Sequence, residues 1–113
     1  MKIHPIGTLC LTTLALLAIS ISASADRLAD GKKAYETNCA SCHASGANGA
    51  PLTNNPEDWV QRSDLWEAVL LTHAKEGYLK MPAKGGDTDA SDYDVGVAAE
   101  YMLSVVYPQA QPD

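Results

Sequence analysis

The segment that most restricts the possible fold is TNCASCHASG, residues 37–46. It places two cysteines three positions apart and a histidine directly after the second, at Cys39, Cys42 and His43. A disulfide between these cysteines would close a very short loop and would stabilise a fold little. A small chain buries a limited core and often needs a metal, a cofactor or a disulfide to stabilise it. The use of these three side chains is therefore the first question that the sequence raises.

The N-terminal residues are typical of a secretory signal peptide. Lys2 precedes an apolar stretch from Ile6 to Ile21, and Ala23-Ser24-Ala25 then forms a small-residue cleavage site. The apolar stretch is shorter than the roughly 20 residues of a membrane-spanning helix, so we expect cleavage rather than an uncleaved anchor. The sequence thus predicts a signal peptide at 1–25, one domain at 26–113, export and no membrane insertion of the mature protein.

The composition is acidic and contains no motif of a hydrolase. The chain has 14 Asp and Glu against 8 Lys and Arg, and its net charge is −6. This charge disfavours nucleic acids and anionic membrane surfaces as partners. We find no Ser/His/Asp set, no phosphate-binding glycine loop and no paired carboxylates in an apolar pocket.

Hydrophobic periodicity predicts an all-α domain with three main helices and long loops. The predicted helices span about residues 30–38, from 63 or 64 to Gly77, and from Ser91 to the residue before Pro108. Ser91 offers a hydroxyl N-cap with an acid, Asp94, at the third helical position. The loops at 44–57 and 77–90 are long for a small domain, so something must order them.

Three kinds of site use cysteine and histidine at this spacing. A structural zinc site needs about four ligands, and His73 would have to complete it. A thiol–disulfide oxidoreductase needs a βαβ context, whereas here the motif follows a helix and no strand flanks it. Attachment of a c-type haem uses Cys-x-x-Cys-His, with two thioethers and the histidine as an iron ligand. Haem attachment is favoured, and the other two interpretations stay open.

A haem iron that only transfers electrons needs a second axial ligand. Met102 lies on the apolar stripe of the third predicted helix, so a core role is favoured for it. His73 lies on a helix face, where a place at the surface or the edge of the core is favoured. Met81 lies in a loop, and Pro82 after it restricts its backbone. The residues alone leave open whether Met81 binds iron or fills an apolar gap.

The chain resembles the class I c-type cytochromes, most closely the small bacterial cytochrome c5 group. The segments that carry the resemblance are GKKAYETNCASCHASGANGAP, DWVQR, LWEAVLLTHAKEG, MPAKGG and SDYDVGVAAEYM. It implies a small class I cytochrome c fold around one covalent haem c, bonded through Cys39 and Cys42. It further implies His43 and Met81 as the axial ligands, because the family places its axial methionine in the segment that matches MPAKGG.

The resemblance also implies roles around the haem. The Pro51 carbonyl would accept the other ring N–H of His43, and such partners commonly orient ligating histidines. Trp59 and Arg62 match positions that pack against and hydrogen-bond the haem propionates. Plain core packing explains Trp59 nearly as well, and the alternative for Arg62 is a solvated surface arginine.

Further family positions concern the packing of helices. Gly31 and Tyr35 match positions where the first helix crosses the last, at Ala98 and Tyr101, and a glycine permits close approach there. Some relatives carry a second cysteine pair after the Gly-Gly. This chain has DTDAS there, so we expect the second half of its fold to be looser.

The implied function is that of a periplasmic one-electron carrier rather than an enzyme. We expect transient redox protein partners and a monomer or weak dimer. Lys75, Lys80 and Lys84 suggest a basic rim for docking, with plain solubilisation as the alternative. The apolar shell expected around the haem consists of Leu65, Val69, Leu79, Val95 and Met102.

Two other functions stay open. One is a haem subunit of a larger oxidoreductase complex. The other is a haem-based ligand sensor or peroxidase with a labile methionine ligand.

Overall fold

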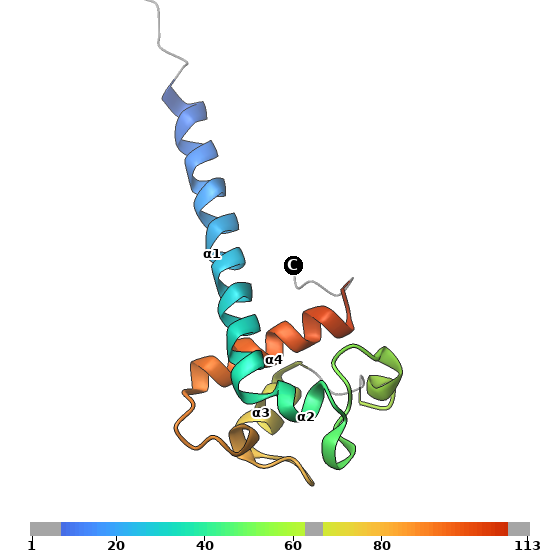
Figure 1. The fold of residues 1–113 in the computed structure, drawn as a ribbon. Coiled ribbons are helices and arrows are strands. Elements are labelled where there is room, and N and C mark those ends of the chain that lie inside the picture. Colours follow the sequence, from blue (N-terminus) through green and yellow to red (C-terminus); the bar gives the residue numbers. More distant parts are fainter. Residues whose placement is uncertain (1–7, 63–66, 109–113) are drawn as a thin grey trace, which may run out of the picture.

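The computed structural model describes residues 8–62 and 67–108, with side chains from residue 22 onward (Figure 1). The α-helices are α1 Thr8–Asn38, α2 Ala40–His43, α3 Glu67–Glu76 and α4 Asp92–Val106; the 3-10 turns are η1 Ala47–Gly49, η2 Pro56–Trp59 and η3 Ala83–Gly86. Within these described ranges the only β pairing is an isolated bridge between Tyr78 and Met81. The all-α prediction is confirmed.

The predicted first helix forms the end of a much longer one. α1 runs without a break from Thr8 to Asn38 and extends away from the rest of the molecule in Figure 1. No helix in the described part of the chain is both long and apolar enough to cross a membrane. The division after Ala25 stays a prediction.

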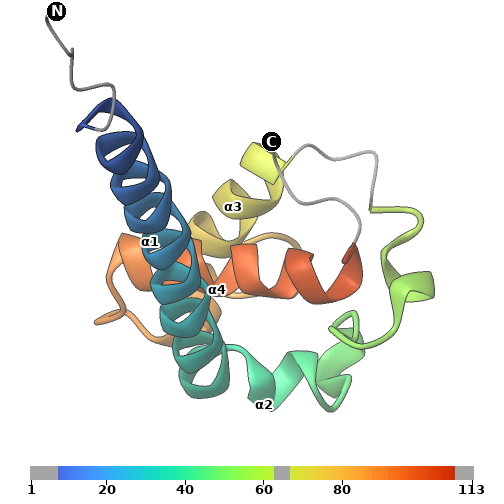
Figure 2. The same cartoon turned by 90° about the horizontal axis from the view of Figure 1, so that it is seen from above.

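α1 passes across α4, and the main hydrophobic core lies at and beside this crossing (Figure 2). The crossing is close because Gly31 has no side chain: a Cβ there would lie 2.3 Å from the Val97 carbonyl oxygen. The rings of Tyr35 and Tyr101 meet beside it, with their centroids 5.4 Å apart. The predicted crossing is thus confirmed. The core residues are Ala34, Tyr35, Trp59, Val97, Ala98, Met102 and Val106.

The ends of α3 and α4 follow local sequence signals. The Ser91 hydroxyl accepts a hydrogen bond from the Asp94 backbone N–H at 3.0 Å, which confirms the predicted N-cap of α4. α3 ends at Glu76 because Gly77 adopts a left-handed φ of 86°. The predicted start of this helix, at residue 63 or 64, lies outside the described residues.

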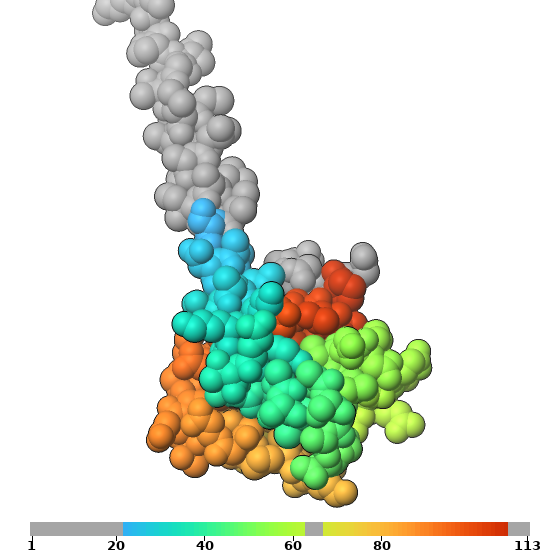
Figure 3. Space-filling view, in the orientation of Figure 1, coloured from blue at the N-terminus to red at the C-terminus, as the bar shows by residue number. Residues whose placement is uncertain are grey.

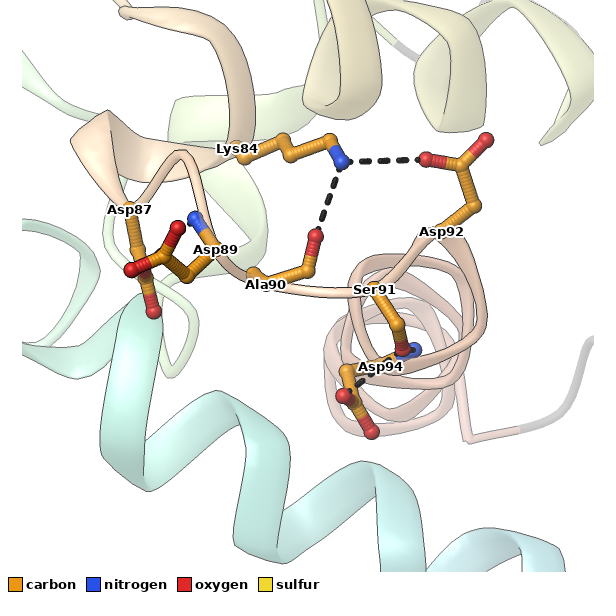
Figure 4. A network of polar contacts seen from close by, with 7 residues as sticks. All are labelled: Lys84, Asp87, Asp89, Ala90, Ser91, Asp92 and Asp94. Atoms are coloured by element: carbon orange, nitrogen blue, oxygen red, sulfur yellow. Dashed lines mark hydrogen bonds and ion pairs between the residues drawn. The ribbon is translucent and has the colours of Figure 1, made fainter.

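Lys84 bridges the loop between η3 and α4, as Figure 4 shows. Its ammonium group donates to the Ala90 carbonyl oxygen at 2.8 Å and lies 3.2 Å from a carboxylate oxygen of Asp92. Lys84 therefore holds this loop on the start of α4. Asp92 pairs with its charge and only 26% of its side chain is exposed, so Lys84 adds little to a basic docking surface; the rim formed by Lys75, Lys80 and Lys84 stays a prediction.

Candidate functional site

The Cys-x-x-Cys-His segment forms one tight helical turn at the end of α1. Cys39 follows α1 directly, and the His43 backbone N–H donates to the Cys39 carbonyl at 2.9 Å. Side chains three and four positions apart on a helical turn share one face. Cys39, Cys42 and His43 therefore present two sulfurs and one imidazole on the same side of α2.

His43 is buried, with 8% of its surface exposed, and its ring is held by two neighbours. Its Nδ1 atom lies 2.8 Å from the Pro51 carbonyl oxygen, which can only accept, so Nδ1 carries the proton and donates. This contact is the one that the resemblance implied. The Trp59 ring lies alongside, 6.2 Å between centroids and 27° between planes. The proton on Nδ1 leaves the lone pair of Nε2 available for a metal.

The thiols do not have the properties of a redox-active pair. Neither Cys39 nor Cys42 is in a disulfide. Burial, and to a lesser degree the neighbouring Cys42, raises the pKa of the Cys39 thiol to about 11. Thiol–disulfide oxidoreductases need a thiolate with a lowered pKa, so this site disfavours that interpretation.

The arrangement also does not bring together a zinc site. Among the described residues, no three His, Cys, Asp or Glu side chains lie close enough to hold a metal ion. His73, the fourth ligand that zinc would have required, instead stacks on the ring of Tyr78.

Met81 lies in a tight turn that follows α3. The backbones of Tyr78 and Met81 exchange two hydrogen bonds, each of 2.9 Å. Pro82 continues the chain in an extended conformation, with φ −70° and ψ 155°, into η3. A Cβ on Gly85 would lie 2.7 Å from the Asn38 carbonyl oxygen, so η3 packs on the residue before Cys39. The methionine loop thus lies beside the cysteine motif.

Trp59 and Arg62 both hydrogen-bond within the polypeptide. The indole N–H of Trp59 donates to the Leu52 carbonyl at 2.9 Å, and only 7% of the residue is exposed. Because indole has one N–H, this bond favours the packing role for Trp59. Arg62 is exposed, and its guanidinium donates to the Asp58 carbonyl oxygen.

The expected apolar shell is only partly buried. Val95 and Met102 are 6% and 7% exposed. Val69 is 38% exposed and Leu79 is 87% exposed on the polypeptide, and their place in a haem shell stays a prediction. Leu79 occupies a turn position with a φ of 51°. Leu65 lies outside the described residues.

Asp58 is a site residue that the sequence analysis missed. Its carboxylate accepts from the Leu52 backbone N–H at 2.9 Å and from the Asn55 side-chain amide at 3.0 Å. Asp58 therefore holds the loop at Leu52, whose carbonyl accepts the indole N–H of Trp59. An acid directly before a buried tryptophan was the only signal in the sequence.

Comparison with known proteins places the chain among cytochromes. A family model described as subunit III of cbb3-type cytochrome c oxidase matches residues 26–102. Cytochrome c-555 of Prosthecochloris aestuarii is 41% identical over 87 residues, which cover 70% of this chain and 88% of that protein. Cytochrome c-551 of Halorhodospira halophila is 43% identical over 82 residues, covering 68% of this chain and all of that protein.

A solved structure shows the same fold. The match is a chain in the crystal structure of an electron transfer complex of nitrite reductase with cytochrome c. Its TM-score is 0.62 at 31% sequence identity, and the match covers 68% of this chain and 94% of that one.

Proposed function

The chain belongs to the class I c-type cytochromes, and we propose that it carries single electrons between redox proteins through one haem c. The family carries its haem covalently, and Cys39 and Cys42 have the spacing of its attachment motif. The observation that carries the proposal is the imidazole of His43, which follows Cys42 directly in the chain and is buried with Nδ1 held by the Pro51 carbonyl at 2.8 Å.

The residues present fit such a group. Cys39 and Cys42 would each form a thioether with one vinyl group of the ring, and His43 would bind iron through Nε2. Met81 would bind iron through its thioether sulfur. Neither cysteine is in a disulfide, so both sulfurs are available for these bonds.

When bound, the haem supplies exchange of one electron between Fe(II) and Fe(III). The Pro51 carbonyl keeps the His43 ring in one orientation and makes its nitrogen a better donor. A methionine ligand favours the reduced state, and buried neighbours such as Met102 and Trp59 exclude water and act in the same direction. If His43 and Met81 both bound the iron, a substrate would have no free position there.

We also propose finer assignments. The match to the family model begins at residue 26, which supports cleavage after Ala25 and a mature domain at 26–113 in the periplasm. The solved relative is part of an electron transfer complex with an enzyme, which supports transient redox proteins as partners. Membership of the cytochrome c5 group rests on the sequence segments quoted above.

One observation favours a second candidate, a subunit of a larger oxidoreductase. The matching family model is described as an oxidase subunit. The size of the native species separates the two: a carrier elutes at the mass of a single small domain, and a subunit elutes with its complex.

The test is a pair of methionine variants of the haem-loaded protein. Met81→Ala is expected to abolish the methionine-to-iron absorption band of the oxidised form and to lower the midpoint potential. Met102→Leu, a conservative change at a buried core methionine, is the control and should keep both. Absence of covalently bound haem from the wild type, or an unchanged band in Met81→Ala, would contradict the proposal.

A further inference from the structure

The rings of His73 and Tyr78 lie face to face at the end of α3. Their centroids are 3.8 Å apart and their planes differ by 5°. His73 belongs to the last turn of α3, and Tyr78 belongs to the segment that leaves the helix after Gly77. The stack therefore fastens the start of the methionine loop back onto the helix that precedes it.

The backbone of Tyr78 is in turn paired with the backbone of Met81. The two residues exchange N–H···O bonds of 2.9 Å in both directions, which closes a two-residue turn at Leu79 and Lys80. Leu79 has a φ of 51°, a conformation that residues with side chains rarely adopt. Such a turn persists because the surrounding contacts hold it. The stack is one of those contacts, and it acts on Met81 through a rigid pair of hydrogen bonds.

The chain on both sides of Met81, at Gly77 and in η3, is also closely packed. A Cβ on Gly77 would lie 2.9 Å from the Ala83 nitrogen and 3.0 Å from the Met81 oxygen, so the chain crosses itself closely. At the far end, η3 packs on Asn38, and in Figure 3 the surface of this segment adjoins the end of α1. Met81 thus lies between two attachments: the ring stack on α3 and the contact of η3 with α1.

We propose that His73 and Tyr78 are positioning residues for Met81, and that their stack holds its sulfur where iron can bind it. This inference rests on the proposed function. A ligand that is held in place before binding loses less conformational freedom when it binds. Removing the stack therefore weakens the binding of Met81 to iron, so an added ligand displaces Met81 at a lower concentration. The substitutions at the stack leave His43 and Met81 themselves unchanged.

The test is a titration of the oxidised, haem-loaded protein with imidazole. Displacement of Met81 is measured as the loss of the methionine-to-iron absorption band. Tyr78→Leu removes the stack, and we expect imidazole to displace Met81 at a concentration about three- to tenfold lower, as a ring pair of ordinary strength predicts. Tyr78→Phe keeps the ring and should behave as the wild type.

His73→Leu tests the stack from the other side. It leaves the turn untouched and places a good helix former in α3. We expect the same direction and a similar size of effect as for Tyr78→Leu. Tyr93→Leu is the matched control, because Tyr93 is 50% exposed, as is Tyr78, but lies on α4. It should leave imidazole displacement unchanged.

The outcomes separate the two proposals. If the wild type lacks the methionine-to-iron band, the ligand assignment fails and this inference fails with it. If the band is present but both leucine variants at the stack bind imidazole as the wild type does, only this inference is overturned. If Tyr78→Leu does not fold, His73→Leu decides the question.

Discussion

Replacing Gly31 by alanine is the sharpest test of how the two main helices pack. The added Cβ would lie 2.3 Å from the Val97 carbonyl oxygen and 3.0 Å from the Tyr101 Cβ. An ordinary contact begins near 3.4 Å, so α1 and α4 would have to separate by about 1 Å. The obstacle is a backbone atom in the middle of α4, so no side-chain rotation can relieve the contact.

The expected cost follows from two opposing effects. Overpacking a core costs about 1–3 kcal/mol, and the upper end applies because the helices themselves must move. Alanine in place of glycine inside a helix returns about 1 kcal/mol. We therefore expect Gly31→Ala to lower the free energy of unfolding by about 2 kcal/mol. For a domain of this size, that corresponds to a melting temperature lower by roughly 8–16 °C.

Gly96→Ala is the matched control within the same helix pair. A Cβ at Gly96 meets only the Lys75 Cε, at 4.0 Å, which is an ordinary contact. This variant should therefore gain about 0.5–1 kcal/mol from helix propensity alone. Denaturant unfolding of both variants, followed by helical circular dichroism, measures the difference. If Gly31→Ala is as stable as the wild type, the described crossing is wrong.

Three further substitutions test local contacts. Ser91→Ala removes the N-cap of α4 and should cost about 1 kcal/mol in denaturant unfolding; Ser91→Thr, whose hydroxyl can still cap and still donate to the Asp94 carboxylate, should cost far less. Trp59→Phe leaves the Leu52 carbonyl without its indole donor and should cost roughly 1–2 kcal/mol in the same assay. The hydrogen bond to Asp30 raises the pKa of the Tyr93 hydroxyl above its ordinary 10.0, so its contribution to stability is complete below pH 10.0 and is lost as the pH rises further. Unfolding midpoints of Tyr93→Phe should lack that alkaline decline, and an identical decline in both proteins would refute the assignment.

Features that depend on neighbours in the sequence could be predicted. Ser91 caps α4 because its partner Asp94 lies three residues away, and Gly77 ends α3 because its own backbone permits a positive φ. Family resemblance added the contact between Pro51 and His43, which no local rule would have found. It also identified Gly31 as a crossing point.

Features that depend on how loops return to helices could not be predicted in the same way. The Lys84 side chain points toward the start of α4 because the loop brings the Ala90 carbonyl and the Asp92 carboxylate within its reach. Leu79 is apolar, yet it lies in a two-residue turn and is 87% exposed on the polypeptide. Hydrophobicity alone does not distinguish a turn position from a buried one.

The sequence by itself therefore determined the N-cap of α4, the end of α3 and the attachment motif, because each depends on residues within one or two turns of chain. The tertiary structure alone decided that His73 stacks on Tyr78, that the Trp59 indole binds Leu52 and that Lys84 turns inward. The physical reason is that each contact depends on the path by which a loop folds back on itself or onto the adjoining helix, and hydrophobic periodicity does not give that path. Among the described glycines, Gly31 is the one at which an added Cβ would lie nearest to another atom.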